Sequence, residues 1–212
     1  MASEIIEKLQ WRYATKSFDT SKKLSEEKIQ IIKEAFNLTA TSYGLQPLKL
    51  VVISNQDLKE QLVSLTMQQK QVAEASHVLV FCTETAVTST YIKEYFDAVE
   101  KARDTPRAVL SPFETFLIDS FSGKSQEEIN EWAARQAYLA MGNLLTVCAL
   151  EEIDACPMEG FEAKKYDTFL NLTAQGLQSV LVMAIGYRSQ DDFFSSMKKV
   201  RRGVEKVVLE MK

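Results

Sequence analysis

The sequence has few of the residues that most often mark a metal site or a histidine-dependent active site. Its 212 residues include one histidine, three cysteines and seven glycines. A zinc hydrolase site is nearly excluded, because the chain offers no second histidine as a ligand. The cysteines are widely spaced and odd in number, which gives neither a disulfide framework nor a zinc knuckle. Since disulfides form in oxidising compartments, we expect a reducing, cytoplasmic location.

Glycine-rich phosphate-binding loops are also missing. No G-x-G-x-x-G motif occurs, so a Rossmann dinucleotide site is unsupported. The segment Ser122–Ser125 (SGKS) ends like a P-loop, but that loop needs a glycine where this chain has Ile118, and it should follow a strand. We interpret the segment as a solvated turn before a helix. A phosphate site in this chain would therefore depend on cationic side chains.

Long apolar runs and broad basic regions are absent as well. Apolar stretches such as Ser179–Tyr187 fall far short of the roughly 20 residues of a membrane helix. The segment Met1–Glu7 lacks the basic-then-apolar pattern of an export signal. A net charge of -4 argues against general nucleic-acid binding, which requires a broad basic face. We expect no membrane and no nucleic-acid partner, and a small anionic ligand suits the chain better.

The spacing of apolar residues predicts a few short strands among many helices. Without a linker or an internal repeat, this pattern favours one domain over residues 1–212 with an α+β or three-layer fold. The helix expected at 126–150 is apolar over most of its circumference, which predicts a buried central helix. Strands are expected at 49–54, 77–85, 178–187 and, at the end, 204–211. The other helices are expected at 3–11, 25–38, 56–72, 91–103, 112–121 and 161–170.

Several isolated residues have plain structural interpretations. His77 opens a buried strand and is interpreted as a structural histidine. Cys82 and Cys148 lie in apolar segments and are expected in the core. Cys156, beside Pro157 and near a loop, is open to exposure, although no neighbouring base or cation is expected to lower its pKa.

Two cationic segments lie far apart in this acidic chain. Arg12–Asp19 (RYATKSFD) follows the first helix, and Lys198–Arg202 lies near the other end. Exposed cations usually face solvent, yet this pair suggests an anion held where the termini meet. Gln136 is a polar residue within an apolar helical stretch, so it needs partners if it is buried. The segment Cys156–Phe161 combines proline with glycine, as occurs where backbone amides approach a ligand.

These segments together resemble the flavin-dependent nitroreductase family, particularly the oxygen-insensitive bacterial NAD(P)H nitroreductases and related dihydropteridine and quinone reductases. The resemblance covers essentially the whole chain. It implies an α+β three-layer sandwich with a central, mostly antiparallel sheet flanked by helices. It also implies a homodimer whose partners exchange their C-terminal strands. The matching segments are Arg12–Asp19, Thr39–Pro47, Ala75–Val78, Trp132–Leu139 with Gly142–Asn143, Pro157–Phe161, Gly186–Arg188 and Lys199–Arg201.

The resemblance further implies one flavin mononucleotide (FMN) in each active site, at the subunit interface. Arg12, Lys199 and Arg201 match positions that hold the FMN phosphate, which suits the geometry of arginine and the charge of lysine. Lys16 matches the lysine near the flavin pyrimidine carbonyl, where a cation stabilises the reduced ring. The full set matched to the cofactor is Arg12, Tyr13, Ala14, Lys16, Thr41, Ser42, Gly44, Gln68, Gln71, Gln136, Pro157, Met158, Glu159, Gly160, Lys199 and Arg201.

Within that set, Thr41–Gly44 matches a loop that the partner subunit supplies. Pro157–Gly160 matches the loop beside the central ring, with a backbone N–H directed at flavin N5, and Gln136 matches a glutamine near the ring edge. The best-known family members carry asparagine and lysine where this chain has Gln68 and Gln71, so a positive charge is lost there.

The implied activity is hydride transfer from NAD(P)H through flavin N5 to a nitroaromatic or quinone acceptor, by a ping-pong mechanism. The cofactor carries this chemistry, so no side chain is expected to be an indispensable acid or base. Alternatives on the same scaffold are the reduction of pteridines, enones or free flavin. A non-catalytic flavin-binding protein is a further alternative.

Overall fold

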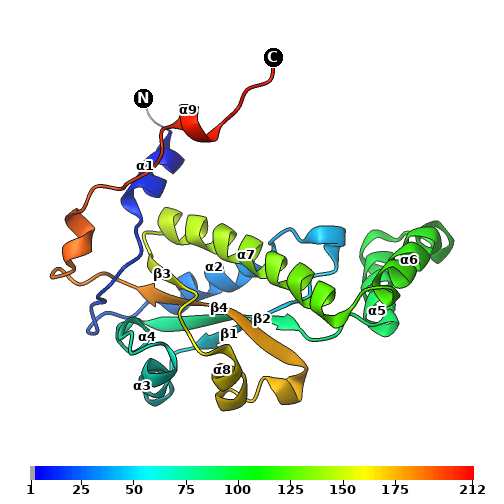
Figure 1. Ribbon diagram of the computed structural model, residues 1–212, viewed down its shortest axis with the longest axis horizontal. Coiled ribbons are helices and arrows are strands. Elements are labelled where there is room, and N and C mark those ends of the chain that lie inside the picture. Colours follow the sequence, from blue (N-terminus) through cyan, green and yellow to red (C-terminus); the bar gives the residue numbers. More distant parts are fainter. Residues whose placement is uncertain (1–2) are drawn as a thin grey trace.

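A computed structural model describes residues 3–212, in which a four-stranded sheet lies between two layers of helices (Figure 1). The strand order is β1-β2-β4-β3, and all three pairings are antiparallel. The three predicted inner strands are confirmed, and β3 is an additional strand where the sequence predicted the approach to a loop. The strands are β1 (Leu48–Ile53), β2 (His77–Glu84), β3 (Asp154–Met158) and β4 (Leu177–Gly186).

The two central strands are β2 and β4, and both are covered on each face. Alternate residues of β4 point to opposite sides: Leu181 and Met183 pack in one apolar cluster, whereas Val182 packs in the other. This explains why their sequences are continuously apolar rather than alternating. His77 begins β2, and its Nδ1 lies 2.9 Å from the Ser76 hydroxyl, so its structural role is confirmed.

Helices α2 (Glu26–Asn37) and α7 (Gln126–Leu150) cover one face of the sheet. Helices α3 (Gln56–Leu65), α4 (Gln71–Glu74) and α8 (Ala163–Phe169) lie on the other, which confirms the three-layer arrangement. A capping box between Ser125 and Glu128 starts α7. Short or terminal helical elements are α1 (Glu4–Trp11), α9 (Val204–Val207) and the 3-10 turns η1 (Ser42–Gly44), η2 (Thr173–Gln175) and η3 (Phe193–Ser196).

Helices α5 (Ser89–Arg103) and α6 (Arg107–Ser122) form a hairpin that extends beyond one end of the sheet, hereafter the arm (Figure 1). Arg107 of α6 fastens the hairpin, because its guanidinium donates to Asp97 of α5 at 2.6 Å and its backbone N–H donates to Glu100 of α5 at 3.0 Å. Two hydrogen bonds of 2.8 and 3.0 Å to Glu114, on the same helix, orient the guanidinium. Ser122 ends α6 and Ser125 caps α7, so the SGKS segment is the turn that the sequence predicted.

Besides the missed strand β3, several sequence predictions differ from the structure, including the start of α6, which was expected at 112 and lies at Arg107. The helix expected at 56–72 stops at Leu65, because Met67 and Gln68 adopt left-handed backbone angles, with φ of 52° and 61°. Helix α7 has the predicted bounds but is not buried all round, since Tyr138 is 49% exposed and Leu139 is 56% exposed. Cys156 is buried in β3 rather than open to exposure, whereas Cys82 and Cys148 are buried as predicted.

The chain ends also differ from expectation. The terminal strand expected at 204–211 is absent from this chain, where the one helical turn of α9 is followed by irregular backbone. Helix α1 has the expected bounds, but it leaves the apolar side chains of Ile5, Ile6 and Leu9 exposed. The predictions about an export signal (Met1–Glu7) and a single domain (residues 1–212) extend to Met1 and Ala2, which lie outside the described residues. None of the helices from residue 3 onward is long and apolar enough to cross a membrane.

Candidate functional site

The cationic segment Arg12–Asp19 is anchored to the sheet at two points. Ala14 forms a parallel bridge with Ala155 of β3, and Phe18 forms an antiparallel bridge with Arg188, just after β4. The intervening Thr15 is fully buried. The segment therefore lies along the end of the sheet, where it meets the chain's C-terminal region.

Asp192, which the sequence did not single out, holds this segment in place. It is 3% exposed, and its Oδ2 accepts hydrogen bonds from the Tyr13 hydroxyl at 2.9 Å and from the backbone N–H groups of Lys16 at 2.7 Å and Ser17 at 3.0 Å. Burial acts to raise the pKa of Asp192, but these hydrogen bonds outweigh it and leave that pKa below its ordinary value. The carboxylate thus positions the backbone between Tyr13 and Ser17.

Three cations gather beside this segment without a carboxylate partner. Arg12 is half-buried, and its Nε is buried with no hydrogen-bond partner. Burial and the charge of Arg201 lower the pKa of Arg12. Burial also lowers the pKa of Lys199, followed by the charges of Arg12 and Arg201. Within residues 3–212 none of the three forms a salt bridge, so they present donors and positive charge to a ligand.

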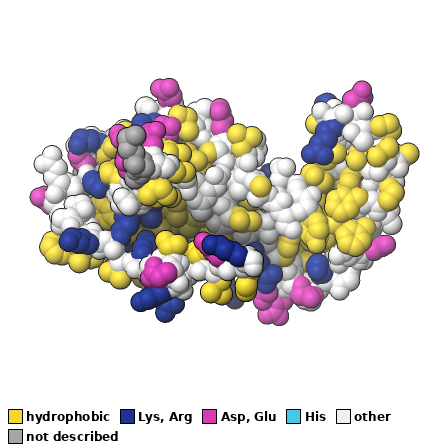
Figure 2. Space-filling view, turned by 90° about the horizontal axis from the view of Figure 1, so that it is seen from above, with side chains coloured by type: hydrophobic (Ala, Val, Ile, Leu, Met, Phe, Trp, Pro, Cys, Tyr) yellow, Lys and Arg dark blue, Asp and Glu magenta, His cyan; other side chains and the backbone are white. Residues whose placement is uncertain are grey.

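A fourth nearby cation, Arg188, differs in having a carboxylate partner: it forms a salt bridge with Asp154, although its buried Nη2 has no hydrogen-bond partner among the described residues. Its Nε donates to Asp154 at 2.6 Å, and its guanidinium lies 4.2 Å from the ring centre of Trp11 and 4.6 Å from that of Tyr13. These stacking contacts fix Tyr13 and the end of α1. A cavity of about 270 Å³ lies against Tyr13 and Lys199. Several dark-blue basic side chains also gather at this end of the molecule in Figure 2.

The predicted loop after Pro157 begins later than expected, because Pro157 and Met158 belong to β3. Gly160 follows, where an added β-carbon would lie 3.2 Å from the Gln69 amide nitrogen and 3.3 Å from the Met67 sulfur. Gln69 donates to the Gly160 carbonyl at 2.9 Å. The sequence did not indicate Gln69, and the adjacent Gln68 was predicted instead. Glycine therefore permits a close approach between this loop and the break after α3.

Glu159 in the same loop is connected to α7. Its carboxylate accepts a hydrogen bond of 2.8 Å from the Tyr138 hydroxyl, and this bond raises the pKa of Tyr138. Of the other predicted residues nearby, Lys16 and Gln68 are exposed, whereas Gln71 is 8% exposed. Their roles toward a cofactor stay predictions.

The Thr41–Gln46 loop lies at the other end of α7, beside the arm (Figure 1). Gln136 is 4% exposed, and both ends of its amide are satisfied: it accepts from the Ser42 N–H at 2.8 Å and donates to the Trp132 carbonyl at 2.9 Å. The expected partners of a buried glutamine are therefore the loop and its own helix. One chain thus carries two separated sets of predicted residues, one at the termini and one at the arm.

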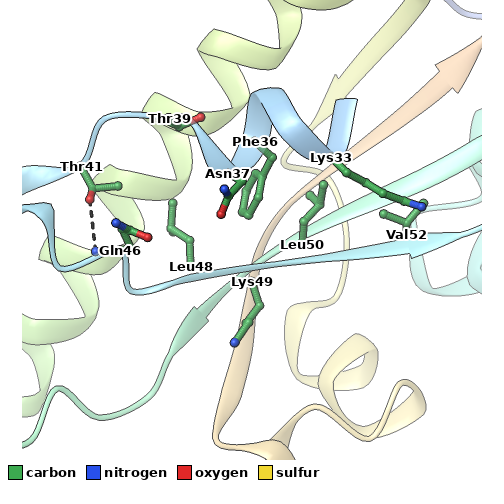
Figure 3. Close-up of a pocket in the computed structure, with 10 residues that line it drawn as sticks. All are labelled: Lys33, Phe36, Asn37, Thr39, Thr41, Gln46, Leu48, Lys49, Leu50 and Val52. Atoms are coloured by element: carbon green, nitrogen blue, oxygen red, sulfur yellow. Dashed lines mark hydrogen bonds between the residues drawn. The ribbon is translucent and has the colours of Figure 1, made fainter. Parts of the chain in front are cut away.

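A groove of about 430 Å³ runs along the edge strand β1, close to this loop (Figure 3). Phe36 of α2 and Leu48 and Leu50 of β1 line it. Thr41 accepts the hydrogen bond from the Gln46 N–H that closes one end of the groove, at 3.2 Å. In the described part of the chain, β1 pairs with β2 alone, so its outer backbone groups are free to pair with another strand.

Comparisons with known proteins agree with this architecture. A model of the nitroreductase family matches residues 9–187. A Staphylococcus haemolyticus protein provisionally named NAD(P)H nitroreductase is 33% identical over 216 residues, covering 98% of this chain and 97% of the relative. A Staphylococcus aureus protein with the same provisional name is 34% identical over 219 residues, covering 98% of this chain and 96% of its own.

Solved structures share the fold. A nitroreductase from Bacillus subtilis, also provisionally named, has a TM-score of 0.87 at 20% identity, covering 98% of this chain and 99% of its own. One from Exiguobacterium sibiricum, solved in complex with FMN, has a TM-score of 0.83 at 21% identity, covering 100% of this chain and 99% of its own. From the family match and the coverage of the relatives, the chain belongs to the nitroreductase family.

Proposed function

We propose that this protein is an FMN-dependent oxidoreductase that takes hydride from NAD(P)H and passes it to nitroaromatic or quinone acceptors. The observation that carries the proposal is the set of unpaired cations formed by Arg12, Lys199 and Arg201, with the buried Nε of Arg12 lacking any partner. A phosphate monoester supplies acceptors for such donors, and arginine binds it through paired hydrogen bonds. The provisional names of the relatives and the FMN complex of a structural neighbour agree with this ligand.

The residues of the terminal region fit the rest of a flavin. Asp192 fixes the Lys16 backbone, and the proposal assigns the exposed Lys16 side chain to the pyrimidine carbonyl. Gln69 and Tyr138 hold the 157–160 loop, which the proposal sets beside the ring, from two sides, and Gly160 allows the close contact with Gln69. FMN held by these residues would supply the hydride chemistry through its N5, and the nucleotide and the acceptor would use the same site in turn.

A second copy of the chain completes the proposed site. The Thr41–Gln46 loop lies at the arm end of α7, away from the cations at the termini, so a dimer would bring the loop of one subunit to the cations of the other. The exposed apolar side chains of α1 and the middle of α7 supply contact surface for the partner. We propose this homodimer, with one FMN-binding domain spanning the chain.

The C-terminal strand exchange is part of the same proposal. The segment after Gly203 exposes Val208, Leu209 and Met211 at 51%, 87% and 92%. The groove along β1 offers an unpaired strand edge and an apolar lining at Phe36 and Leu48. Addition of the partner's terminal segment to this edge would bury both apolar surfaces and turn that segment into a strand.

The absorbance spectrum of the purified protein tests the proposed function. We expect a yellow protein with stoichiometric FMN, which NADH or NADPH bleaches in the absence of oxygen and a nitroaromatic or quinone recolours. A protein that binds FMN but is not bleached would contradict the enzymatic function, and a colourless protein that fails to take up added FMN would contradict both cofactor and activity. Rates with a panel that adds a pteridine, an enone and free flavin distinguish the acceptor classes.

A further inference from the structure

The Thr41–Gln46 loop has a backbone that most side chains disfavour. Tyr43, Gly44 and Gln46 have φ values of 58°, 73° and 50°, all in the left-handed region. Gln136 holds one end of the loop through the Ser42 N–H at 2.8 Å. Contacts from other elements must hold the remainder in this conformation.

The arm supplies the first of these contacts through Leu45. This side chain is 2% exposed and packs in the apolar cluster of the arm, together with Phe96 and Leu117. The middle of the loop is therefore part of the arm's core rather than of either core cluster on the main sheet.

Two tyrosines on α5, one helical turn apart, make the other contacts. The Tyr91 hydroxyl lies 2.8 Å from the Leu45 carbonyl oxygen and 3.0 Å from that of Gln46, so its single proton is shared between these two acceptors. Burial raises the pKa of Tyr91 to about 12, so this hydroxyl keeps its proton well above neutral pH. The Tyr95 hydroxyl lies against Gly44, where a β-carbon would collide with it, but it makes no hydrogen bond in the described part of the chain.

We propose that Tyr91 is a positioning residue of the flavin site, because its hydroxyl fixes the loop that carries Thr41 and Ser42 to the arm. This inference rests on the proposed function, in which that loop contacts the FMN held by the partner subunit. Since Leu45 and Tyr91 fasten the same loop segment to α5 and the arm's core, the loop follows any displacement of the arm. The arm thereby influences cofactor binding without touching the cofactor.

The test uses two variants that each remove one hydroxyl from the same helix. Tyr91→Phe deletes the hydrogen bonds to the loop, whereas Tyr95→Phe is the matched control, since its hydroxyl has no such bond. For Tyr91→Phe we expect the amides of residues 42–46 to exchange with deuterium about fivefold faster in the FMN-free protein, the effect of losing one neutral hydrogen bond. We also expect its Kd for FMN to rise about fivefold, with Tyr95→Phe close to the unmodified protein in both measurements.

The two measurements distinguish the role of Tyr91 from FMN binding by the protein as a whole. Unchanged amide exchange in Tyr91→Phe would overturn the attachment of the loop by Tyr91, whether or not FMN binds. Faster exchange with an unchanged Kd for FMN would overturn its positioning role at the flavin. Equal effects in the two variants would also overturn it, because the hydrogen bonds would then not be the cause. Failure of the unmodified protein to bind FMN would overturn the proposed function and, with it, the flavin role of Tyr91.

Discussion

Two cations are buried at least in part, Lys59 in the α3–α4 layer and Arg12 at the end of α1, but only Lys59 has hydrogen-bond acceptors within the part of the protein that the structure describes. Lys59 on α3 is fully buried, and its ammonium donates to the backbone carbonyls of Ala75 at 2.5 Å, Ser76 at 3.3 Å and Ala73 at 3.4 Å. Arg12 at the end of α1 is half-buried, yet its Nε finds no acceptor, and no carboxylate among residues 3–212 pairs with it.

This difference distinguishes a structural cation from one that awaits a ligand. An unpaired buried donor lowers the free energy of unfolding by about 1–3 kcal/mol, so a fold that keeps one is less stable than a fold in which that donor is paired. At Arg12 the nearby charges of Lys199 and Arg201 add repulsion, which a bound anion would remove. At Lys59 the backbone carbonyls supply hydrogen-bond acceptors for the ammonium, although burial and the charge of Lys23 still lower its pKa. This contrast supports the proposal that an anion binds at the chain ends rather than at Lys59.

The largest effect is expected from Asp192, whose carboxylate organises the segment that carries Arg12. Asp192→Ala leaves the Tyr13 hydroxyl and the N–H groups of Lys16 and Ser17 without their acceptor, and we expect a loss of about 3 kcal/mol in the free energy of unfolding by urea. The control is Asp191→Ala, since Asp191 is exposed and adjacent. Equal stability of the two variants would show that Asp192 does not hold the segment.

Arg12→Ala should weaken FMN binding without lowering the stability of the FMN-free protein. Loss of a charged hydrogen-bond donor to phosphate is expected to raise the Kd for FMN roughly 30-fold, equivalent to about 2 kcal/mol, in fluorescence titrations. The free energy of unfolding without FMN should not fall, because the removed group is unpaired in the FMN-free fold. Arg202→Ala, which removes an exposed charge next to Arg201, is the control and should leave the Kd nearly unchanged. An unchanged Kd in Arg12→Ala would remove the main support for the phosphate site.

Lys59 should give the smallest effect, visible in the pH dependence of stability. Burial, together with the charge of Lys23, lowers the pKa of Lys59 from 10.5 to about 8. The folded protein then binds fewer protons at this site than the unfolded chain, so stability increases as the pH rises from 8 toward 10.5. We expect a contribution of about 1 kcal/mol between pH 7 and 9 in urea unfolding. Lys59→Met should lack this increment, and identical pH profiles for the two proteins would show that its carbonyl partners fully offset burial.

Elements with strong local signals were predicted well from the sequence. The apolar runs of β2 and β4 and the Ser125 start of α7 were recognised because each signal lies within a few neighbouring residues. The break after Leu65 was missed, because no glycine or proline marks the left-handed backbone at Met67 and Gln68. Strand β3 was also missed, because Pro157 near its end is typical of a loop. The segment is a strand because it pairs with β4, a contact that its own sequence does not indicate.

The sequence by itself determined the central strands and most of the helices, and it marked the cations at both chain ends as a candidate anion site. The tertiary structure alone decided which cations are satisfied, because that depends on partners far along the chain. Asp192 lies 176 positions from Lys16, and Tyr91 lies 46 positions from Leu45, so no local pattern indicates either contact. Hydrogen bonds between such distant residues form only once the sheet, the arm and the chain ends are in place, and they decide which groups remain free for a ligand.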